Sequence, residues 1–156
     1  MTPMFNCILV IDDDEPTNFF TSMILEEYPC ARHTRIVQSG MEALEYLTAA
    51  AKPDGYEKGF PYPDLVLVDI NMPAMNGWEF LEEYKKLDKP YCPKIMMLTT
   101  SLFPGDKEKA AEMPEVSGFE NKPLTVEKLE NIIKQHFMNV GKVYSGGKTQ
   151  NGQAAA

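Results

Sequence analysis

Short apolar segments and amphipathic segments alternate along almost the whole chain, and this alternation is the feature that most restricts its fold. Each of five apolar runs of strand length is followed by a run with helical spacing. Such alternation is typical of a parallel sheet that is covered by helices on both faces. We therefore predict an α/β protein. The predicted strands are 6–12, 33–39, 64–69, 94–100 and 116–122, and the predicted helices are 15–28, 40–51, 77–87, 104–113 and 125–137.

The first predicted helix begins with clear signals, whereas the last does not. Pro16 suits a first helical turn, and Asp14 is a good N-cap because its carboxylate can accept N–H groups of that turn. Helix 125–137 opens on Thr125 without an acidic residue three positions later, so its cap signal is weak. The apolar residues with helical spacing in the first helix are Phe19, Phe20, Met23, Ile24 and Tyr28.

One long connection and one tail interrupt the alternation. Segment 52–63 carries three prolines and two glycines, which predicts a surface loop. Segment 140–156 is small, polar and aperiodic, so it is predicted to be disordered or part of an appended expression sequence. We expect one domain over residues 1–139. With 19 residues after Phe137, we expect no separate output module.

Charge and cysteine content argue against several classes of function. The formal net charge of −8 disfavours direct binding to nucleic acid or to anionic membranes, since both attract lysine and arginine. Cys7, Cys30 and Cys92 are widely spaced and form no CxxC motif, which argues against a disulfide framework or a zinc site. No signal peptide or membrane-spanning run is evident. We therefore expect a cytoplasmic protein with reduced thiols.

Polar residues follow the ends of the predicted strands. The carboxyl ends of parallel strands lie at one edge of a sheet, where ligands of such folds bind. We therefore expect these side chains to lie close together. They are Asp12, Asp13 and Asp14 after the first strand, Asp69 at the end of the third, Thr99 in the fourth and Lys122 at the end of the fifth.

This set of side chains suits phosphoryl transfer. Neighbouring carboxylates repel each other unless a cation lies between them, and hard oxygen ligands favour Mg²⁺. We expect Asp12 and Asp13 to hold the metal, and Lys122 and Thr99 to contact phosphate oxygens. Asp69 lies alone at the end of a central strand and is the best-placed nucleophile, because a carboxylate can accept a phosphoryl group.

Four sequence motifs together resemble the receiver domain of bacterial two-component response regulators, in particular stand-alone, chemotaxis-regulator-like members. The resemblance covers about residues 6–137. The separations from Asp69 to Thr99 and from Thr99 to Lys122 fit the family, while the longer gap before Asp69 matches the 52–63 loop. The motifs are IDDD at 11–14, DINMPAMNG at 69–77, LTTS at 98–101 and NKP at 121–123.

The resemblance implies a role for each residue at the strand ends. It makes Asp69 the phosphoacceptor, which takes phosphate from a sensor histidine kinase or a histidine phosphotransfer protein. Asp13 corresponds to the direct metal ligand, Asp12 to a ligand that often acts through water, and the backbone carbonyl of Asn71 to a further ligand. Lys122 corresponds to the lysine that contacts the phosphate. The expected cofactor is Mg²⁺, and the family fold is flavodoxin-like, with strand order 2-1-3-4-5.

The resemblance also implies a conformational switch. Thr99 corresponds to a hydroxyl that moves toward the phosphate, although Thr100 could compete for this role. Phe119 corresponds to an aromatic residue that turns inward with it, and it lacks the hydroxyl of the tyrosine often found there. The altered surface would change the binding of a downstream protein or let the phosphate be relayed onward. Such a protein is not an enzyme in the ordinary sense, because it phosphorylates and dephosphorylates itself with Mg²⁺.

Three other functions occur in folds of this class, and two of them conflict with the sequence. A flavin-binding protein needs a phosphate-cradling loop after the first strand, whereas the acidic residues 12–15 would repel a phosphate. An aspartyl-phosphate phosphatase commonly has a second Asp two positions after the nucleophile, and here that residue is Asn71. A receiver-like docking module that acts without phosphorylation stays as the alternative.

Overall fold

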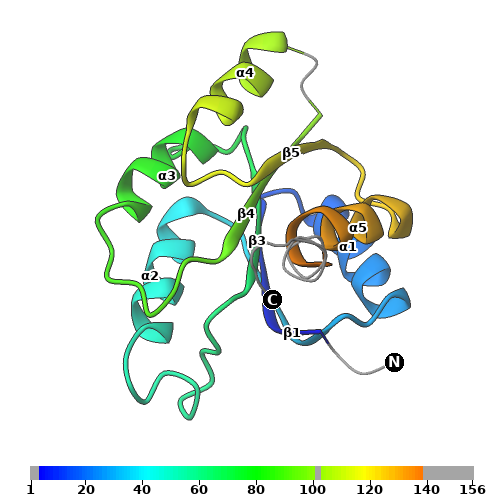
Figure 1. The fold of residues 1–156 in the computed structure, drawn as a ribbon. Helices are drawn as coiled ribbons and strands as arrows, with labels where there is room; N and C mark the ends of the chain where they lie inside the picture. Colours follow the sequence, from blue (N-terminus) through cyan, green and yellow to red (C-terminus); the bar gives the residue numbers. More distant parts are fainter. Residues whose placement is uncertain (1–3, 101–102, 139–156) are drawn as a thin grey trace, which may run out of the picture. The chain divides into compact units, whose positions relative to one another are not determined.

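The computed structural model describes residues 4–100 and 103–138, and it contains one sheet of five parallel strands (Figure 1). The strand order is β2-β1-β3-β4-β5, so β3 is the central strand. The predicted sheet and its order are confirmed. The predicted tail, 140–156, lies outside the described residues. The strands are β1 (Phe5–Ile11), β2 (Ala31–Val37), β3 (Leu65–Asp69), β4 (Lys94–Thr99) and β5 (Gly118–Asn121).

Four helices belong to the same compact unit as the sheet, which ends at Leu124. Within this unit α1 lies on one face of the sheet, and α2 and α3 lie on the other (Figure 1). The prediction of helices on both faces is therefore confirmed, while the domain boundary at residue 139 stays a prediction. These helices are α1 (Glu15–Glu27), α2 (Gly40–Ala50), α3 (Gly77–Tyr84) and α4 (Pro104–Glu112).

A second unit begins at Thr125 and contains α5 (Val126–Ile133), followed by a π-helical turn, η1 (Lys134–Met138). The weak cap signal at Thr125 is misleading, because its hydroxyl accepts the backbone N–H of Lys128 at 3.1 Å. A threonine alone is enough to satisfy one unpaired N–H of the first turn. None of the described helices is long and apolar enough to cross a membrane.

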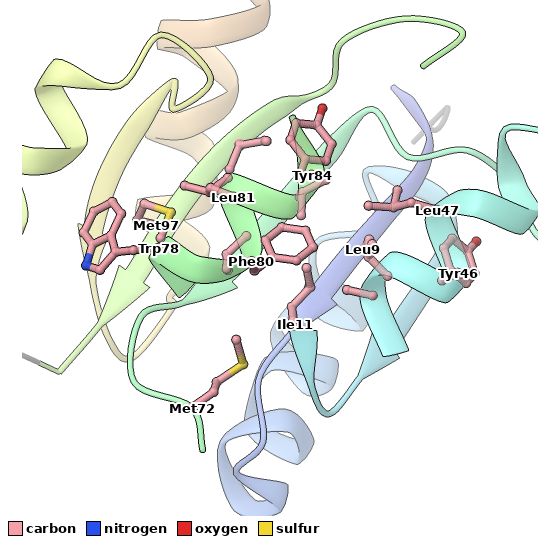
Figure 2. Packing of buried hydrophobic residues seen from close by; sticks show 14 of the residues in the cluster. Leu9, Ile11, Tyr46, Leu47, Met72, Trp78, Phe80, Leu81, Tyr84 and Met97 are labelled. Atoms are coloured by element: carbon pink, nitrogen blue, oxygen red, sulfur yellow. The ribbon is translucent and has the colours of Figure 1, made fainter. Parts of the chain in front are cut away.

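The main hydrophobic cluster lies between the sheet and the helices α2 and α3 (Figure 2). All five residues of β3 are buried, which is expected for a central strand of a doubly covered sheet. Each fully buried aliphatic or aromatic side chain contributes roughly 1.5–3 kcal/mol. The cluster therefore fixes the position of β3, and with it Asp69. Its members include Leu9, Ile11, Tyr46, Leu47, Val66, Val68, Phe80, Leu81, Tyr84 and Met97.

The structure differs from the sequence-based expectation at the surface of α1. Its buried residues are Asn18, Thr21 and Leu25, whereas Phe19 is 70% exposed. Phe20 and Met23 are exposed as well. The helical period was predicted correctly, but several apolar residues that carry it point to solvent.

The loop 52–63 is only partly a surface loop. Residues 61–63 are buried, and the hydroxyl of Tyr46 donates a hydrogen bond to the carbonyl of Pro61 at 2.6 Å. Phe60 also contacts the Tyr46 ring edge-on, with 5.6 Å between ring centroids. Phe60 and Pro61 therefore make part of this segment a packed cover for α2, which the proline and glycine content did not indicate.

Candidate functional site

Two carboxylates are buried at the ends of adjacent strands. Asp69 ends β3, and Asp12 follows β1 directly, next to it in register because Ile11 pairs with Val68. Asp12 is 3% exposed and Asp69 is 6% exposed. Burying two carboxylates costs free energy unless other groups compensate for their charge. The surrounding residues supply that compensation.

Lys122 is the cation that meets both carboxylates. Its ammonium group forms an ion pair with Oδ2 of Asp12 and lies 3.3 Å from Oδ1 of Asp69. The backbone N–H of Lys122 donates to the carbonyl of Thr99 at 2.8 Å, which ties the end of β5 to the end of β4. The sequence predicted that Lys122 would approach this edge, and the structure places it between the two acids.

The pKa values of this group follow from burial and mutual interaction. Burial raises the pKa of Asp69, and the nearby charge of Asp12 raises it too, while the Lys122 ammonium group opposes them without cancelling their effect. Burial alone would lower the pKa of Lys122, but its hydrogen bond and ion pair with Asp12, together with the charge of Asp69, raise it overall. Ionised Asp69 therefore has less positive charge nearby than would be needed to keep its pKa at the ordinary value.

Asp12, Asp13 and Asp69 could hold a metal ion together. One carboxylate oxygen from each residue lies within 4.8 Å of the others, and Asp13 is exposed while the other two are buried. Hard oxygen ligands with one side open to solvent suit Mg²⁺, which keeps several waters and takes phosphate oxygens as ligands. The donor set thus fits the predicted cofactor, and the shortage of positive charge at Asp69 gives a physical reason for a cation here.

The loop after Asp69 makes a tight turn that brings Gly77 back to the end of β3. The N–H of Asn71 donates to Oδ1 of Asp69 at 3.4 Å, and the N–H of Gly77 donates to the carbonyl of Ile70 at 2.8 Å. A Cβ atom on Gly77 would lie 2.6 Å from the carbonyl oxygen of Asp69, so only glycine fits there. Ala74 has a φ of 66°, which is strained for a residue with a side chain.

The two candidates for the switch hydroxyl differ in burial. Thr99 is fully buried at the end of β4, while Thr100 is exposed. Phe119 pairs with Met97 in the sheet, is half-buried and packs against the hydrophobic cluster. This burial favours Thr99 for the switch role, which stays a prediction, as do the role of Phe119 and the part of the Asn71 carbonyl.

Asn18 was missed by sequence reasoning. Its side-chain N–H donates to the backbone carbonyl of Asp12 at 2.8 Å, and its own side-chain oxygen is buried without a hydrogen-bond partner among the described residues. The available signal was an amide side chain four positions after the N-cap, one helical turn from the acidic segment. That cap is confirmed, because Asp14 accepts the N–H of Thr17 at 3.0 Å.

Comparison with known proteins places the chain in a family. Residues 8–134 match the Response regulator receiver domain. The chain belongs to this family. Among solved structures, this receiver is similar to the two-component response regulator from Cytophaga hutchinsonii, with a TM-score of 0.72 and 29% identity. The match covers 84% of this chain and 96% of that one.

Two curated relatives are considerably longer than this receiver. It is 30% identical over 141 residues to a probable cyclic di-GMP phosphodiesterase of Vibrio cholerae, covering 89% of this chain and 28% of that protein. It is 30% identical over 146 residues to a protein-glutamate methylesterase/protein-glutamine glutaminase of Desulfotalea psychrophila, covering 86% of this chain and 36% of that protein. The chain thus spans well under two thirds of the length of either relative.

Proposed function

We propose that this receiver accepts a phosphoryl group on Asp69, with Mg²⁺ held by Asp12, Asp13, Asp69 and the backbone carbonyl of Asn71. The observation that carries the proposal is the arrangement around Asp69. This buried carboxylate lies 3.3 Å from the Lys122 ammonium group and within metal-binding distance of two further acids. A nucleophile, a phosphate-binding cation and a metal-ligand set are together what phosphoryl transfer requires.

The reaction is a transfer between two proteins. A carboxylate oxygen of Asp69 attacks the phosphorus of a phosphohistidine on the donor, the P–N bond breaks, and an acyl phosphate forms on Asp69. Bound Mg²⁺ supplies neutralisation of the charge on the transferred group. Lys122 contributes a second positive charge, because its ammonium group lies close enough to Asp69 to donate a hydrogen bond to an oxygen of the phosphoryl group there. Attack of water on the acyl phosphate would restore Asp69 and release inorganic phosphate.

The donor is proposed to be a sensor histidine kinase or a histidine phosphotransfer protein. In-line transfer requires the reacting atoms to come within about 3–3.5 Å, so the donor must cover the surface around Asp69. The exposed Phe19, Phe20 and Met23 begin one helical turn after the acidic segment. An exposed apolar patch of this kind is typical of a protein contact site.

The output is proposed to be a change in binding of a downstream protein, or transfer of the phosphate onward. Phosphorylation would draw Thr99 toward the phosphate and let the half-buried Phe119 turn further inward. A partner that prefers this conformation shifts the population toward it. The receiver then acts as a phosphoacceptor switch rather than as an enzyme with a separate product, and a cytoplasmic location stays a prediction.

The switch can be tested by amide NMR spectra of the protein with Mg²⁺ and acetyl phosphate, using EDTA in place of Mg²⁺ as control. We expect new signals for residues around Asp69, Thr99 and Phe119 that appear only with Mg²⁺ and decay after the phosphodonor is removed. If the spectra with and without acetyl phosphate are identical, the receiver is a docking module that acts without phosphorylation.

A further inference from the structure

A pocket of about 360 Å³ lies far from Asp69 in the same unit. It is formed by the end of α3, the start of β4 and the segment before β5, whereas Asp69 and Lys122 follow the carboxyl ends of their strands. Because β4 has six residues at about 3.3 Å each, the two edges are roughly 20 Å apart. The pocket is thus separate from the proposed phosphoryl site.

The lining of this pocket is basic, although the chain as a whole is acidic. Lys85, Lys89 and Lys94 line it, against a single carboxylate, Glu115. In a chain with a formal net charge of −8, three lysines around one concave site form a local positive potential. A pocket of this size can enclose a small molecule, and its charge selects an anion.

The three lysines differ in the hydrogen bonds and ion pairs that their ammonium groups already make. The ammonium group of Lys89 lies over the Tyr84 ring, 4.7 Å from its centroid, and donates to the carbonyls of Lys85 and Leu87. Lys85 contacts Glu82 at 3.3 Å and Glu115 at 3.9 Å. Lys94 is half-buried, and within the described residues its ammonium group makes no hydrogen bond or ion pair. An ammonium group that no protein group engages is free to meet the charge of a bound anion.

Glu115 adds a second requirement for the ligand. Its Oε1 atom is buried and accepts no hydrogen bond from the described residues; the Lys85 ammonium group faces the same atom, but at 3.9 Å it is too far away to donate one. Buried polar atoms in proteins are nearly always hydrogen-bonded, so this oxygen needs a donor. An anion with a hydroxyl or amino group beside its charge would satisfy Lys94 and Glu115 together. Inorganic sulfate, which carries no O–H group at neutral pH, would satisfy the lysine alone.

We propose that this pocket binds a small phosphorylated metabolite, such as a sugar phosphate, through Lys94 and Lys85, with a ligand hydroxyl donating to Glu115. The proposal does not depend on phosphorylation of Asp69. Binding here would let a metabolite act on the receiver from the opposite edge of the sheet.

The test is a titration with ribose 5-phosphate that is monitored by amide NMR spectra. EDTA is present throughout, so that no metal occupies the acidic site. We expect saturable shifts confined to residues that line the pocket, and weaker binding of inorganic sulfate. Lys94→Gln should weaken binding at least tenfold, while Lys94→Arg should keep most of it. Lys107→Gln is the matched control, because it removes an equal charge from an exposed position on α4 outside the pocket.

Two further variants distinguish binding in this pocket from binding at the phosphoryl site and from attraction by charge alone. Glu115→Leu should bring the affinity for ribose 5-phosphate toward that for inorganic sulfate, because the acceptor for the ligand hydroxyl is lost. Asp69→Asn should bind ribose 5-phosphate as the wild type does. The proposal is wrong if the shifts do not saturate, if they centre on Lys122, or if Lys94→Gln and Lys107→Gln weaken binding equally.

Discussion

The folded protein disfavours the ionised form of Asp69, chiefly because this carboxylate is buried. Because its pKa is raised in the folded state, ionised Asp69 makes the free energy of unfolding smaller at neutral pH. This cost is absent below the unfolded-state pKa of about 3.9, where the carboxyl group is protonated in both states. Asp69→Asn should therefore stabilise the metal-free protein by on the order of 1 kcal/mol at pH 7.

The gain should shrink as the pH falls from the raised pKa of folded Asp69 toward about 4, and it should be absent at lower pH. Urea unfolding in EDTA at several pH values measures it. Asp88→Asn is the control, because it removes the same charge from an exposed position, where an effect within about 0.5 kcal/mol is expected. A metal-free Asp69→Asn protein that is less stable than the wild type at pH 7 would show that the attraction of Lys122 outweighs burial.

The three cysteines should differ sharply in reactivity. Burial raises the pKa of Cys7 to about 11 and also raises the pKa of Cys30, whereas Cys92 is exposed. The thiolate is the reactive form, so the native protein should take up one iodoacetamide quickly, at Cys92, and three after unfolding. Intact mass against time measures this. Rapid modification of Cys7 in native protein would contradict the packing of β1.

At the scale of elements, the turn from β3 into α3 depends on the close contact between Gly77 and the backbone carbonyl of Asp69. Gly77→Ala would place a methyl group 2.6 Å from the carbonyl oxygen of Asp69, and backbone there cannot move without displacing Asp69. We expect a loss of about 1–3 kcal/mol in stability and a slower rate of phosphorylation by acetyl phosphate.

Gly59→Ala is the matched control for this element. Gly59 has a φ of 95°, so alanine there is strained, but its Cβ would meet no atom within 4 Å. It should cost stability and leave the phosphorylation rate per folded molecule unchanged. Equal loss of rate in both variants would mean that the effect comes from general destabilisation.

The elements were predictable wherever one physical signal dominated. The buried strands follow from continuous apolar runs, and each observed boundary lies within two residues of its prediction, except at the ends of α3 and α5. The first of these helices ends at Tyr84 rather than residue 87, and the second ends at Ile133, where the π-helical turn takes over.

Which apolar residues are buried was harder to predict than where the elements lie. The exposed face of α1 was not predictable, because Phe19 and Leu25 have similar hydrophobicity and only tertiary packing decides which of them is buried. The cover formed by Phe60 and Pro61 was missed for the same reason.

At the scale of the whole molecule, folding and metal binding should be coupled. Mg²⁺ that binds only the folded state raises its stability by about 2.7 kcal/mol at a hundred times the dissociation constant. The melting temperature of the wild type should therefore rise with Mg²⁺, and Asp13→Asn should reduce this rise. Glu15→Gln, an exposed acid near the site, should leave it intact. An equal rise in all three proteins would contradict the proposed ligand set.

The site was predictable because it follows from topology. Once β1, β3, β4 and β5 are parallel, Asp12, Asp69, Thr99 and Lys122 must lie at one edge of the sheet. What the sequence could not give is the pairing within that edge. The contact of Lys122 with both acids and the hydrogen bond from Asn18 to Asp12 depend on side-chain positions, which only coordinates supply.

The central claim is that Asp69 accepts a phosphoryl group in a reaction that depends on Mg²⁺. Intact mass after incubation with acetyl phosphate, on the wild type and on Asp69→Asn, tests it most directly. We predict one phosphate on the wild type with Mg²⁺, none with EDTA, and none on the variant under either condition. A phosphate adduct that persists on Asp69→Asn, or a folded wild type that takes up none with Mg²⁺, would contradict the claim.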